Sequence, residues 1–262
     1  MTPPVLILTG YGVNCEAESA AAWEMAGARA DLVHLNDLLA SPARLHEYGA
    51  LMFIGGFSFG DHMGSGLAFS LRVRHRLRED LERFLDAGKL VLGVCNGFQV
   101  MVKLGLLPAL DGVRFEQTVS LIRNDGGHFQ NFWVRLGFDP DSPCVFTRGL
   151  AAMDLPIRHG EGRLFTPDPK HMRDLADRRL VACTYRKPDG SAATSFPHNP
   201  NGSLLSAAGL SDPTGRVFGL MPHPEAFLFP ENHPRWTRDG GSDGPGTGLA
   251  LFENGVAAMR DS

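Results

Sequence analysis

Residues 91–101 have the sequence VLGVCNGFQVM, in which a single cysteine stands between two glycines directly after an apolar run. The apolar residues 90–92 have the character of a central parallel strand. After Gly97, apolar residues recur at helical spacing. We therefore predict a sharp strand-to-helix turn over residues 93–97, which matches the G-x-S-x-G nucleophile elbow with cysteine in place of serine.

Cys95, at the centre of this turn, has two interpretations. Most free cysteines are small buried apolar residues without a chemical role. The flanking glycines suit a nucleophile, because a tight turn that strains its central residue leaves no room for side chains on either flank, but this motif alone leaves the structural interpretation ahead. A nucleophile also needs a base to activate it, so the choice depends on finding a base elsewhere in the chain.

Strands and helices alternate in the first half of the chain. Four apolar runs predict buried strands, at residues 5–9, 29–35, 50–54 and 89–94. Amphipathic segments predict helices over 15–28 and 67–88, with Asn14 as the N-cap of the first. This order predicts an α/β protein with an open, mostly parallel sheet and helices on both faces.

The second half contains shorter β-like runs, separated by turns rich in proline, glycine and asparagine. The runs span residues 119–122, 129–138, 154–158, 162–165, 180–185, 192–196 and 216–221. A last helix is expected over 247–259. We predict that these β-rich additions complete the same sheet, so that residues 1–262 form a single domain. The Gly- and Pro-rich tract 229–248 is predicted to be an exposed loop.

Composition excludes several classes of function. The 262 residues carry a formal net charge of −4, with an isoelectric point near 6.2. The chain has no basic run and no apolar stretch of membrane-spanning length, which argues against binding to nucleic acid or membranes. It begins without a signal-peptide pattern, so a cytoplasmic location is expected. Without a C-x-x-C pair, we expect reduced thiols and no zinc site among Cys15, Cys95, Cys144 and Cys183.

A candidate base follows the last predicted strand. His223 stands between two prolines, which restrict the backbone on either side of it, and Glu225 comes two residues later. A carboxylate at that spacing can hydrogen-bond one imidazole nitrogen and leave the other free to face a thiol. A histidine near a strand end is often only a turn residue, but this setting favours catalysis. We predict Cys95, His223 and Glu225 as a catalytic triad.

These motifs resemble those of the class I, triad-type glutamine amidotransferases, with G-x-C-x-G-x-Q at the nucleophile and a late His-x-Glu. The chain is more similar to the glutaminase subunit of phosphoribosylformylglycinamidine synthase, through CNGFQ at 95–99 and GGFSFGD at 55–61. Further segments typical of that family are PIRHGEGRL (156–164), NPNGS (199–203) and LMPHPE (220–225). Ile54, Phe59 and His128 depart from the family pattern, and none belongs to the triad.

The resemblance implies a flavodoxin-like amidotransferase fold and a Cys95 γ-glutamyl thioester formed from L-glutamine. By the same resemblance, the backbone amides of Gly56 and Asn96 would hold the oxyanion, and Gln99 would bind the substrate. The ammonia would serve a large synthetase subunit that converts formylglycinamide ribonucleotide to formylglycinamidine ribonucleotide. No cofactor is expected on this chain, because ATP and magnesium would bind to that subunit. A small accessory subunit is also expected.

Other interpretations remain open. The chain could be a cysteine-elbow hydrolase of another amide or ester, a glutaminase for a different synthetase, or a non-catalytic domain that regulates one. Gln99 and the glycine loop favour a glutaminase over other hydrolases, and the intact triad argues against a non-catalytic role. His159 and Glu161 could suggest a metal site, but no third ligand stands near them in the sequence.

Overall fold

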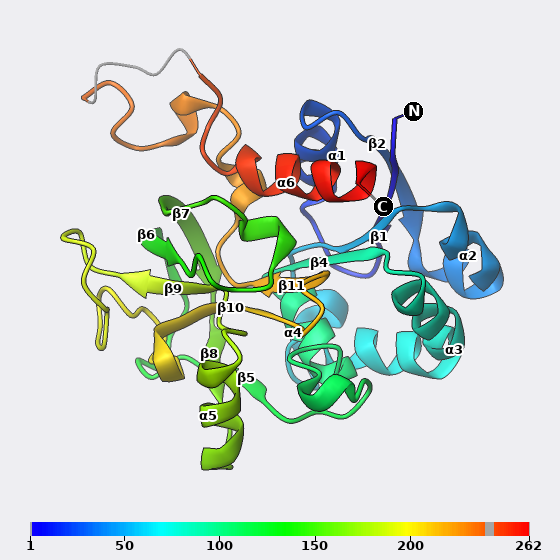
Figure 1. Ribbon diagram of the computed structural model, residues 1–262, viewed down its shortest axis with the longest axis horizontal. Helices are drawn as coiled ribbons and strands as arrows, with labels where there is room; N and C mark the ends of the chain where they lie inside the picture. Colours follow the sequence, from blue (N-terminus) through cyan, green and yellow to red (C-terminus); the bar gives the residue numbers. More distant parts are fainter. Residues whose placement is uncertain (1, 239–243, 262) are drawn as a thin grey trace.

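A nine-stranded sheet runs through the computed structural model, which describes residues 2–238 and 244–261 (Figure 1). The strands of its parallel half are, in sheet order, β2 (Arg29–His34), β1 (Pro4–Thr9), β3 (Ala50–Phe53), β4 (Leu90–Val94) and β11 (Val217–Leu220). Both β3 and β4 are buried along their whole length, as strands covered on both faces must be. The predicted parallel core is confirmed.

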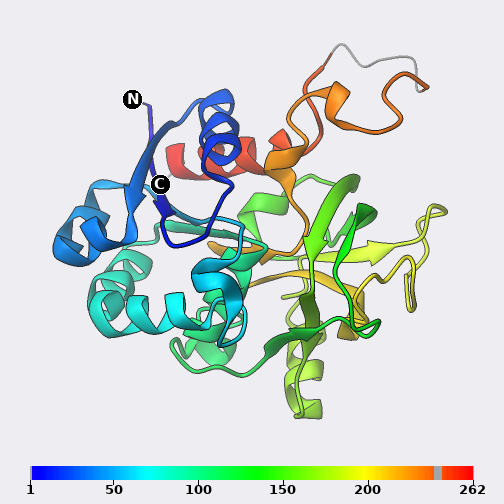
Figure 2. The ribbon, with the colours of Figure 1, turned by 180° about the vertical axis from the view of Figure 1, so that it is seen from behind.

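Helices cover both faces of this parallel half (Figure 1). On one face α1 (Glu16–Met25) packs against α6 (Leu249–Arg260), and on the other α3 (Leu67–Asp86) packs against α4 (Asn96–Leu104). Figure 2 shows the same two layers from behind. The buried side of α3 is an apolar stripe at spacings of three and four, made by Phe69, Val73, Leu77, Leu81 and Phe84.

The other half of the sheet is antiparallel. It adds, in order from β11, the strands β10 (Ala207–Ser211), β9 (Cys183–Arg186), β6 (Gln130–Phe138) and β7 (Ala152–His159). A separate two-stranded sheet pairs β5 (Ser120–Arg123) with β8 (Glu161–Phe165). The antiparallel half curves back over the parallel half, because β7, last in the order, contacts the segment that follows β11.

Some local predictions differ from the structure. Residues 192–196 form no strand, because polar residues and a following proline end the run after one isolated bridge. Strand β10 carries no local strand signal, because its small residues lack the bulky side chains typical of strands and only its two neighbours define it. Two helices, α2 (Leu35–Ala40) and α5 (Pro169–Asp177), were also not predicted, although Asp168 caps α5 by accepting a hydrogen bond from the N–H of Lys170 at 2.8 Å.

The described parts of the 229–248 tract project from the body of the molecule (Figure 1) and are mostly exposed. Residues 239–243 of the predicted loop lie outside the described residues. The tract returns at Gly248, where a Cβ would collide with the carbonyl oxygen of Pro224, so α6 begins directly against the His223 segment. In the part of the chain that the structure describes, no helix combines the length and apolarity needed to cross a membrane.

The carboxyl ends of the parallel strands gather the predicted catalytic residues. Cys95 follows β4, His223 follows β11, and the glycine loop of residues 55–61 follows β3. Because β3, β4 and β11 are adjacent and parallel, the three segments emerge at the same edge of the sheet. This edge is where open α/β sheets place their ligand sites.

Candidate active site

Cys95 occupies a strained turn between β4 and α4. Its backbone has φ 51° and ψ −108°, a conformation that costs a non-glycine residue on the order of 1–3 kcal/mol. A Cβ at Gly97 would collide with the carbonyl oxygen of Phe53 on β3. A Cβ at Gly93 would collide with the Met101 sulfur on α4. The glycines let the helix lie close against the sheet while the turn holds the thiol, as in a nucleophile elbow.

His223 and Glu225 form a buried hydrogen-bonded pair. The Nδ1 atom of His223 lies 2.6 Å from Oε1 of Glu225, and each residue is 2% exposed. The backbone N–H of His223 donates to the carbonyl of Pro156 on β7 at 2.9 Å. A 3₁₀ turn over Pro224–Ala226 then brings the carboxylate back to the ring. Nε2 of the ring has no hydrogen-bond partner within the described residues, so it is free to act on a substrate.

The surroundings of His223 favour its charged form. Burial by itself would lower the pKa of the ring, because it disfavours the imidazolium. The negative charge of Glu225 raises the pKa, as do the thiols of Cys95 and Cys15, and together they outweigh burial, so the pKa of His223 lies well above its ordinary value. The ring can therefore take and hold a proton from a thiol, as activation of a cysteine nucleophile requires.

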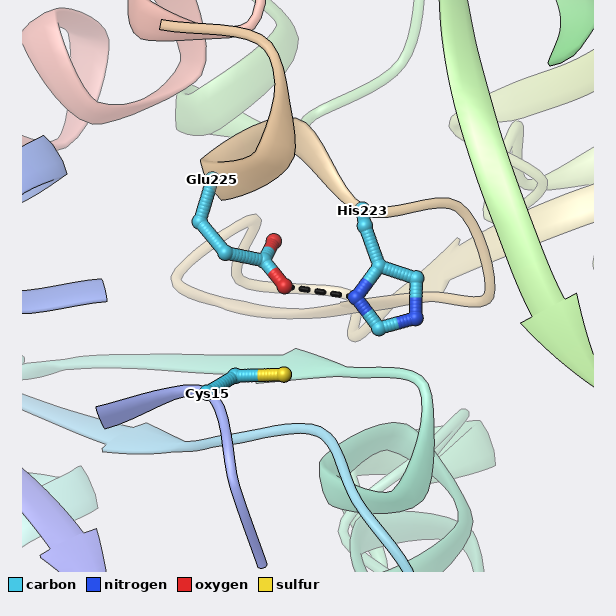
Figure 3. A group of neighbouring side chains, drawn as sticks. All are labelled: Cys15, His223 and Glu225. Atoms are coloured by element: carbon cyan, nitrogen blue, oxygen red, sulfur yellow. Dashed lines mark hydrogen bonds and ion pairs between the residues drawn. The ribbon is translucent and has the colours of Figure 1, made fainter. Parts of the chain in front are cut away.

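A second thiol, Cys15, lies beside this pair (Figure 3). Cys15 occupies the N-cap position of α1 in place of the predicted Asn14, and its side chain makes no capping hydrogen bond. Burial raises the pKa of the Cys15 thiol, while its hydrogen bond with His223 acts in the opposite direction. The thiol is thus placed by the chain path from β1 into α1 and not by capping.

The two remaining cysteines are part of the hydrophobic core. Burial raises the pKa of Cys144 to about 11 and that of Cys183 well above its ordinary value. A thiol that keeps its proton is a poor nucleophile. Of the four cysteines, all within the described residues, only Cys15 and Cys95 adjoin the His223 ring.

Asn96 ties the glycine loop to the elbow. Its Oδ1 accepts a hydrogen bond from the Ser58 N–H at 3.2 Å, and its Nδ2 donates to Asp61 at 3.2 Å. In the same loop Gly56 has φ +131°, and a Cβ there would stand 2.5 Å from the Cα of Val13. Asn96 begins α4, so its own N–H has no acceptor within the helix. The predicted oxyanion donors thus lie on connected segments, and their catalytic role stays a prediction.

Gln99 links the elbow helix to β8. Its Oε1 accepts a hydrogen bond from Nδ2 of Asn96 at 2.9 Å, and its Nε2 donates to the backbone carbonyl of Glu161. The residue is buried, and each end of its amide has a partner inside the chain. The structure therefore places Gln99 as a connection between the elbow helix of the main sheet and the separate β5–β8 sheet. Its predicted contact with the substrate stays a prediction.

Strand β7 brings main-chain groups to the nucleophile. The thiol of Cys95 lies 3.5 Å from the carbonyl oxygen of Arg158, which accepts its hydrogen bond. Behind the strand, Asn124 donates to the carbonyl of His159 at 2.9 Å and accepts from the N–H of Gly162 at 3.1 Å. One asparagine side chain therefore fixes the turn between β7 and β8.

His159 is a buried histidine that stays neutral. Burial, with a smaller contribution from repulsion by His223, lowers its pKa to about 3. Its Nδ1 lies 3.2 Å from Oδ1 of Asn124. The carboxylate of Glu161 instead accepts a hydrogen bond from the N–H of Ser65 at 3.3 Å. The two side chains considered as metal ligands in the sequence thus have separate partners.

Sequence reasoning assigned no role to Asp61, Asn124 or Cys15, three residues that the structure places at or behind the site. Asp61 lies in the glycine loop, so its proximity to the elbow could be predicted from that motif. Asn124 lies in a turn between two predicted β runs, where asparagine is common. Nothing in the sequence around Cys15 indicates that its side chain lies beside His223 and Glu225, more than two hundred residues later.

Comparison with known proteins assigns the fold and the site to a family. Residues 2–258 match the family of CobB/CobQ-like glutamine amidotransferase domains. The chain is 43% identical over 238 residues to "Phosphoribosylformylglycinamidine synthase subunit PurQ" of Methanococcus maripaludis, covering 90% of this chain and 86% of that protein. Against the subunit of the same name from Dehalococcoides mccartyi it is 41% identical over 255 residues, 97% of each chain. This chain belongs to the PurQ family of glutamine amidotransferases.

A solved structure supports the PurQ assignment at the level of the fold. A chain in "Structure of PurLQS from Thermotoga maritima" superposes with a TM-score of 0.72 and 27% sequence identity, covering 98% of this chain and 99% of that one. The elbow and the β-rich additions of the second half are therefore parts of one PurQ-type fold. The family resemblance predicted from the sequence motifs is confirmed.

Proposed function

We propose that this chain is the glutaminase subunit of phosphoribosylformylglycinamidine synthase, which hydrolyses L-glutamine and supplies ammonia to a synthetase. The observation that carries the proposal is the 2.6 Å contact between Nδ1 of His223 and Oε1 of Glu225, in a chain whose elbow presents Cys95. The relatives named PurQ, at 41% and 43% identity over nearly the whole chain, support this choice of synthetase over another.

The first half of the reaction forms a thioester. The proton of the Cys95 thiol passes to Nε2 of His223, and the thiolate attacks the side-chain amide carbon of glutamine. The N–H groups of Gly56 and Asn96 stabilise the oxyanion that forms. When the intermediate collapses, the C–N bond breaks and His223 gives its proton to the leaving nitrogen, so ammonia departs and a γ-glutamyl thioester remains.

The second half releases glutamate. His223 takes a proton from water as the water oxygen attacks the thioester carbon, and the C–S bond then breaks. The sulfur regains a proton from the ring, so the enzyme returns to its starting state. Glu225 holds Nδ1 of the ring throughout, which keeps Nε2 directed at the reacting atoms.

The synthetase that uses the ammonia is a separate large subunit, where ATP, magnesium and formylglycinamide ribonucleotide bind. The name of the PurLQS assembly supports a large partner, and we also place a small accessory subunit in the complex. This chain itself then needs no cofactor and acts as one amidotransferase domain over residues 1–262 in the cytoplasm. The family match over residues 2–258 supports the single domain.

Two exposed aromatic rings mark where we place the large subunit. Phe57, in the glycine loop, is 46% exposed, and Phe129 is 48% exposed. Their ring centroids lie 6.1 Å apart, so they form one apolar patch beside the loop that is tied to the elbow. Apolar surface of this kind at the edge of a site is typical of a protein–protein contact.

The variant Cys95→Ala, in the complex with the synthetase, tests the proposal. The thiolate is needed only to release ammonia, so glutamine-dependent synthesis should be lost while ammonia-dependent synthesis stays near the wild-type rate. The ammonia reaction is the internal control for folding and assembly. Turnover with glutamine in this variant would exclude Cys95 as the nucleophile.

A panel of glutamine, other amides and simple esters separates the glutaminase from a general cysteine hydrolase. We expect hydrolysis of glutamine alone, because ammonia delivery requires that other substrates be rejected. Faster hydrolysis of an ester than of glutamine would favour the general hydrolase.

A further inference from the structure

Three metal-binding side chains from two distant segments converge at the proposed base, His223. The Sγ atom of Cys15, a ring nitrogen of His223 and a carboxylate oxygen of Glu225 all lie within 4.8 Å of one another. Figure 3 shows the thiol approaching the hydrogen-bonded pair from the β1–α1 side. All three side chains are buried, so each donor atom is held in a defined position.

Gly55 makes this approach possible. A Cβ at this position would stand 2.9 Å from Cε1 of His223 and 3.0 Å from Sγ of Cys15. Any larger residue would therefore occupy the space between the thiol and the ring. The absence of a side chain at Gly55 therefore lets the thiol and the ring approach each other.

Helix α1 does not require a thiol at its N-cap position. Serine, threonine, aspartate and asparagine are the residues that stabilise an N-cap, and Cys15 makes no capping hydrogen bond. Within the described residues, its sulfur lies 3.6 Å from Oδ1 of Asn14 and also hydrogen-bonds the His223 ring. The contacts of the thiol are therefore with its neighbour and the catalytic pair and not with the helix.

We propose that Cys15, His223 and Glu225 form a binding site for a thiophilic divalent cation, Zn²⁺, and that occupation of this site inhibits the glutaminase. One thiolate, one imidazole and one carboxylate form a donor set that zinc accepts, with a fourth position left for water. On binding, the sulfur–metal bond replaces the S–H bond of Cys15 and the nitrogen–metal bond replaces the Nδ1–H bond of the charged His223 ring, and both protons are released to solvent.

The distances allow such a site after small movements. Zinc bonds of about 2.0–2.3 Å in a tetrahedron place neighbouring ligand atoms roughly 3.3–3.6 Å apart. The 2.6 Å contact between His223 and Glu225 must open by less than about 1 Å, and the thiol, which lies no more than 4.8 Å from the other donors, must close by up to about 1.5 Å.

Inhibition follows from which atoms the ion would use. Coordination at Nδ1 of His223 and at Glu225 removes the hydrogen bond that fixes the ring, so Nε2 no longer faces the nucleophile as a base. This consequence rests on the proposed function. Metal binding itself does not, because it needs neither glutamine nor Cys95.

Cobalt(II) titration tests the site without turnover, because a thiolate bound to Co²⁺ gives a strong near-ultraviolet absorption. The experiment uses the full chain with the nucleophile removed, Cys95→Ala, so that a thiolate ligand must come from another cysteine. We expect one Co²⁺ per chain with this absorption, and its displacement by one equivalent of Zn²⁺. Absence of the thiolate absorption in Cys95→Ala would overturn the proposal, since Cys15, which that variant retains, would then not bind the metal.

The matched variants are Cys15→Ser and Cys144→Ser, the second a buried core thiol away from the base. Loss of one of three protein ligands should weaken Co²⁺ binding by at least roughly 10²-fold in Cys15→Ser, with no change in Cys144→Ser. Cys15→Ala and circular dichroism of each variant separate a lost ligand from a lost fold. Equal affinity in folded Cys15→Ser and wild type would also overturn the proposal.

Inhibition is measured separately, in the complex with the synthetase and with Cys95 present. Zn²⁺ should inhibit glutamine-dependent synthesis in wild type, and the concentration for half inhibition should rise by a similar factor in Cys15→Ser. Ammonia-dependent synthesis should be unaffected by the same Zn²⁺ concentration. Metal binding with no glutaminase activity in the wild type would count against the proposed function alone. Equal inhibition of the wild type and Cys15→Ser by Zn²⁺ would count against the site.

Discussion

The two halves of the sheet contribute different kinds of chemistry to one site. The parallel half presents ionisable side chains, Cys95 and His223 with Glu225, at the carboxyl ends of adjacent strands. The antiparallel half and the small β5–β8 sheet present backbone groups, namely the carbonyl of Arg158 on β7 and that of Glu161 on β8. The proposed reacting atoms thus come from the parallel half, and the surface that surrounds them comes from these other strands.

This difference indicates how each half should respond to substitution. Loss of a reacting side chain removes a proton acceptor or donor, which no neighbour replaces. Loss of a supporting side chain instead leaves buried backbone groups unpaired, which lowers stability and displaces the surface by small amounts. The parallel half should therefore govern activity, and the antiparallel half should govern stability.

The largest effect is expected for His223→Ala. Without the ring there is no acceptor for the thiol proton and no donor for the leaving nitrogen. General acid–base catalysis contributes roughly 10²–10⁴-fold, so kcat/KM for glutamine should fall by at least that factor. Acid quench of a single turnover should trap no thioester. Ammonia-dependent synthesis in the same complex controls for folding, and near wild-type glutaminase activity would remove His223 from the mechanism.

Glu225→Gln should have a smaller effect within the same half. Glu225 orients the ring through one 2.6 Å hydrogen bond, and the flanking prolines already restrict the His223 backbone. Partners that orient a functional histidine are worth on the order of 10- to 100-fold, so kcat should fall by that factor. Pre-steady-state kinetics would measure the loss. A loss equal to that of His223→Ala would show that Glu225 does more than orient.

Asn124→Ala tests the antiparallel half. The substitution removes the partner of the His159 carbonyl and of the Gly162 N–H, both buried. We expect a loss of about 1–3 kcal/mol in the free energy of unfolding, measured with urea, and a decrease in kcat/KM below roughly 10-fold. Asn254→Ala, which loses two bonds to carbonyls of the segment 146–148 far from the elbow, is the control. A decrease in kcat/KM of more than roughly 10-fold, with little change in the free energy of unfolding, would contradict the division between the halves.

The smallest effect on activity is expected at His159, where the change is one of acid sensitivity. Burial lowers its folded pKa to about 3, so the unfolded chain, with a pKa near 6.5, binds more protons between these values. Its contribution to stability is therefore complete above pH 6.5 and is lost as the pH falls toward 3, by up to about 1.4 kcal/mol per pH unit.

The variant His159→Gln should reduce this slope by up to one proton between pH 6 and pH 4.5, as measured by urea unfolding at several pH values. The slope is the readout, because the substitution also changes the level of stability. His62→Gln, at an exposed histidine, is the control. An unchanged slope in His159→Gln would show that His159 is protonated in the folded protein.

Sequence patterns predicted the parallel core and the catalytic groups because both depend on short stretches of chain. The apolar runs that became β1, β3 and β4 are adjacent to glycine turns, and the elbow is a feature of residues 93–97 alone. The His223–Glu225 contact likewise joins residues two apart. Prediction from local sequence failed where neighbouring strands decide the structure. One such element is β10, whose small residues form a strand because they pair with β9 and β11.

The amino-acid sequence by itself determined the local geometry of the proposed catalytic residues, since the turn around Cys95 and the proline-flanked His223 follow from local steric limits. Only the tertiary structure decided what surrounds them. Cys15 reaches the His223–Glu225 pair because segments from opposite ends of the chain meet at one edge of the sheet. The curvature of the antiparallel half brings the Arg158 carbonyl to the nucleophile. Such contacts depend on strand order and sheet shape, which no short stretch of sequence contains.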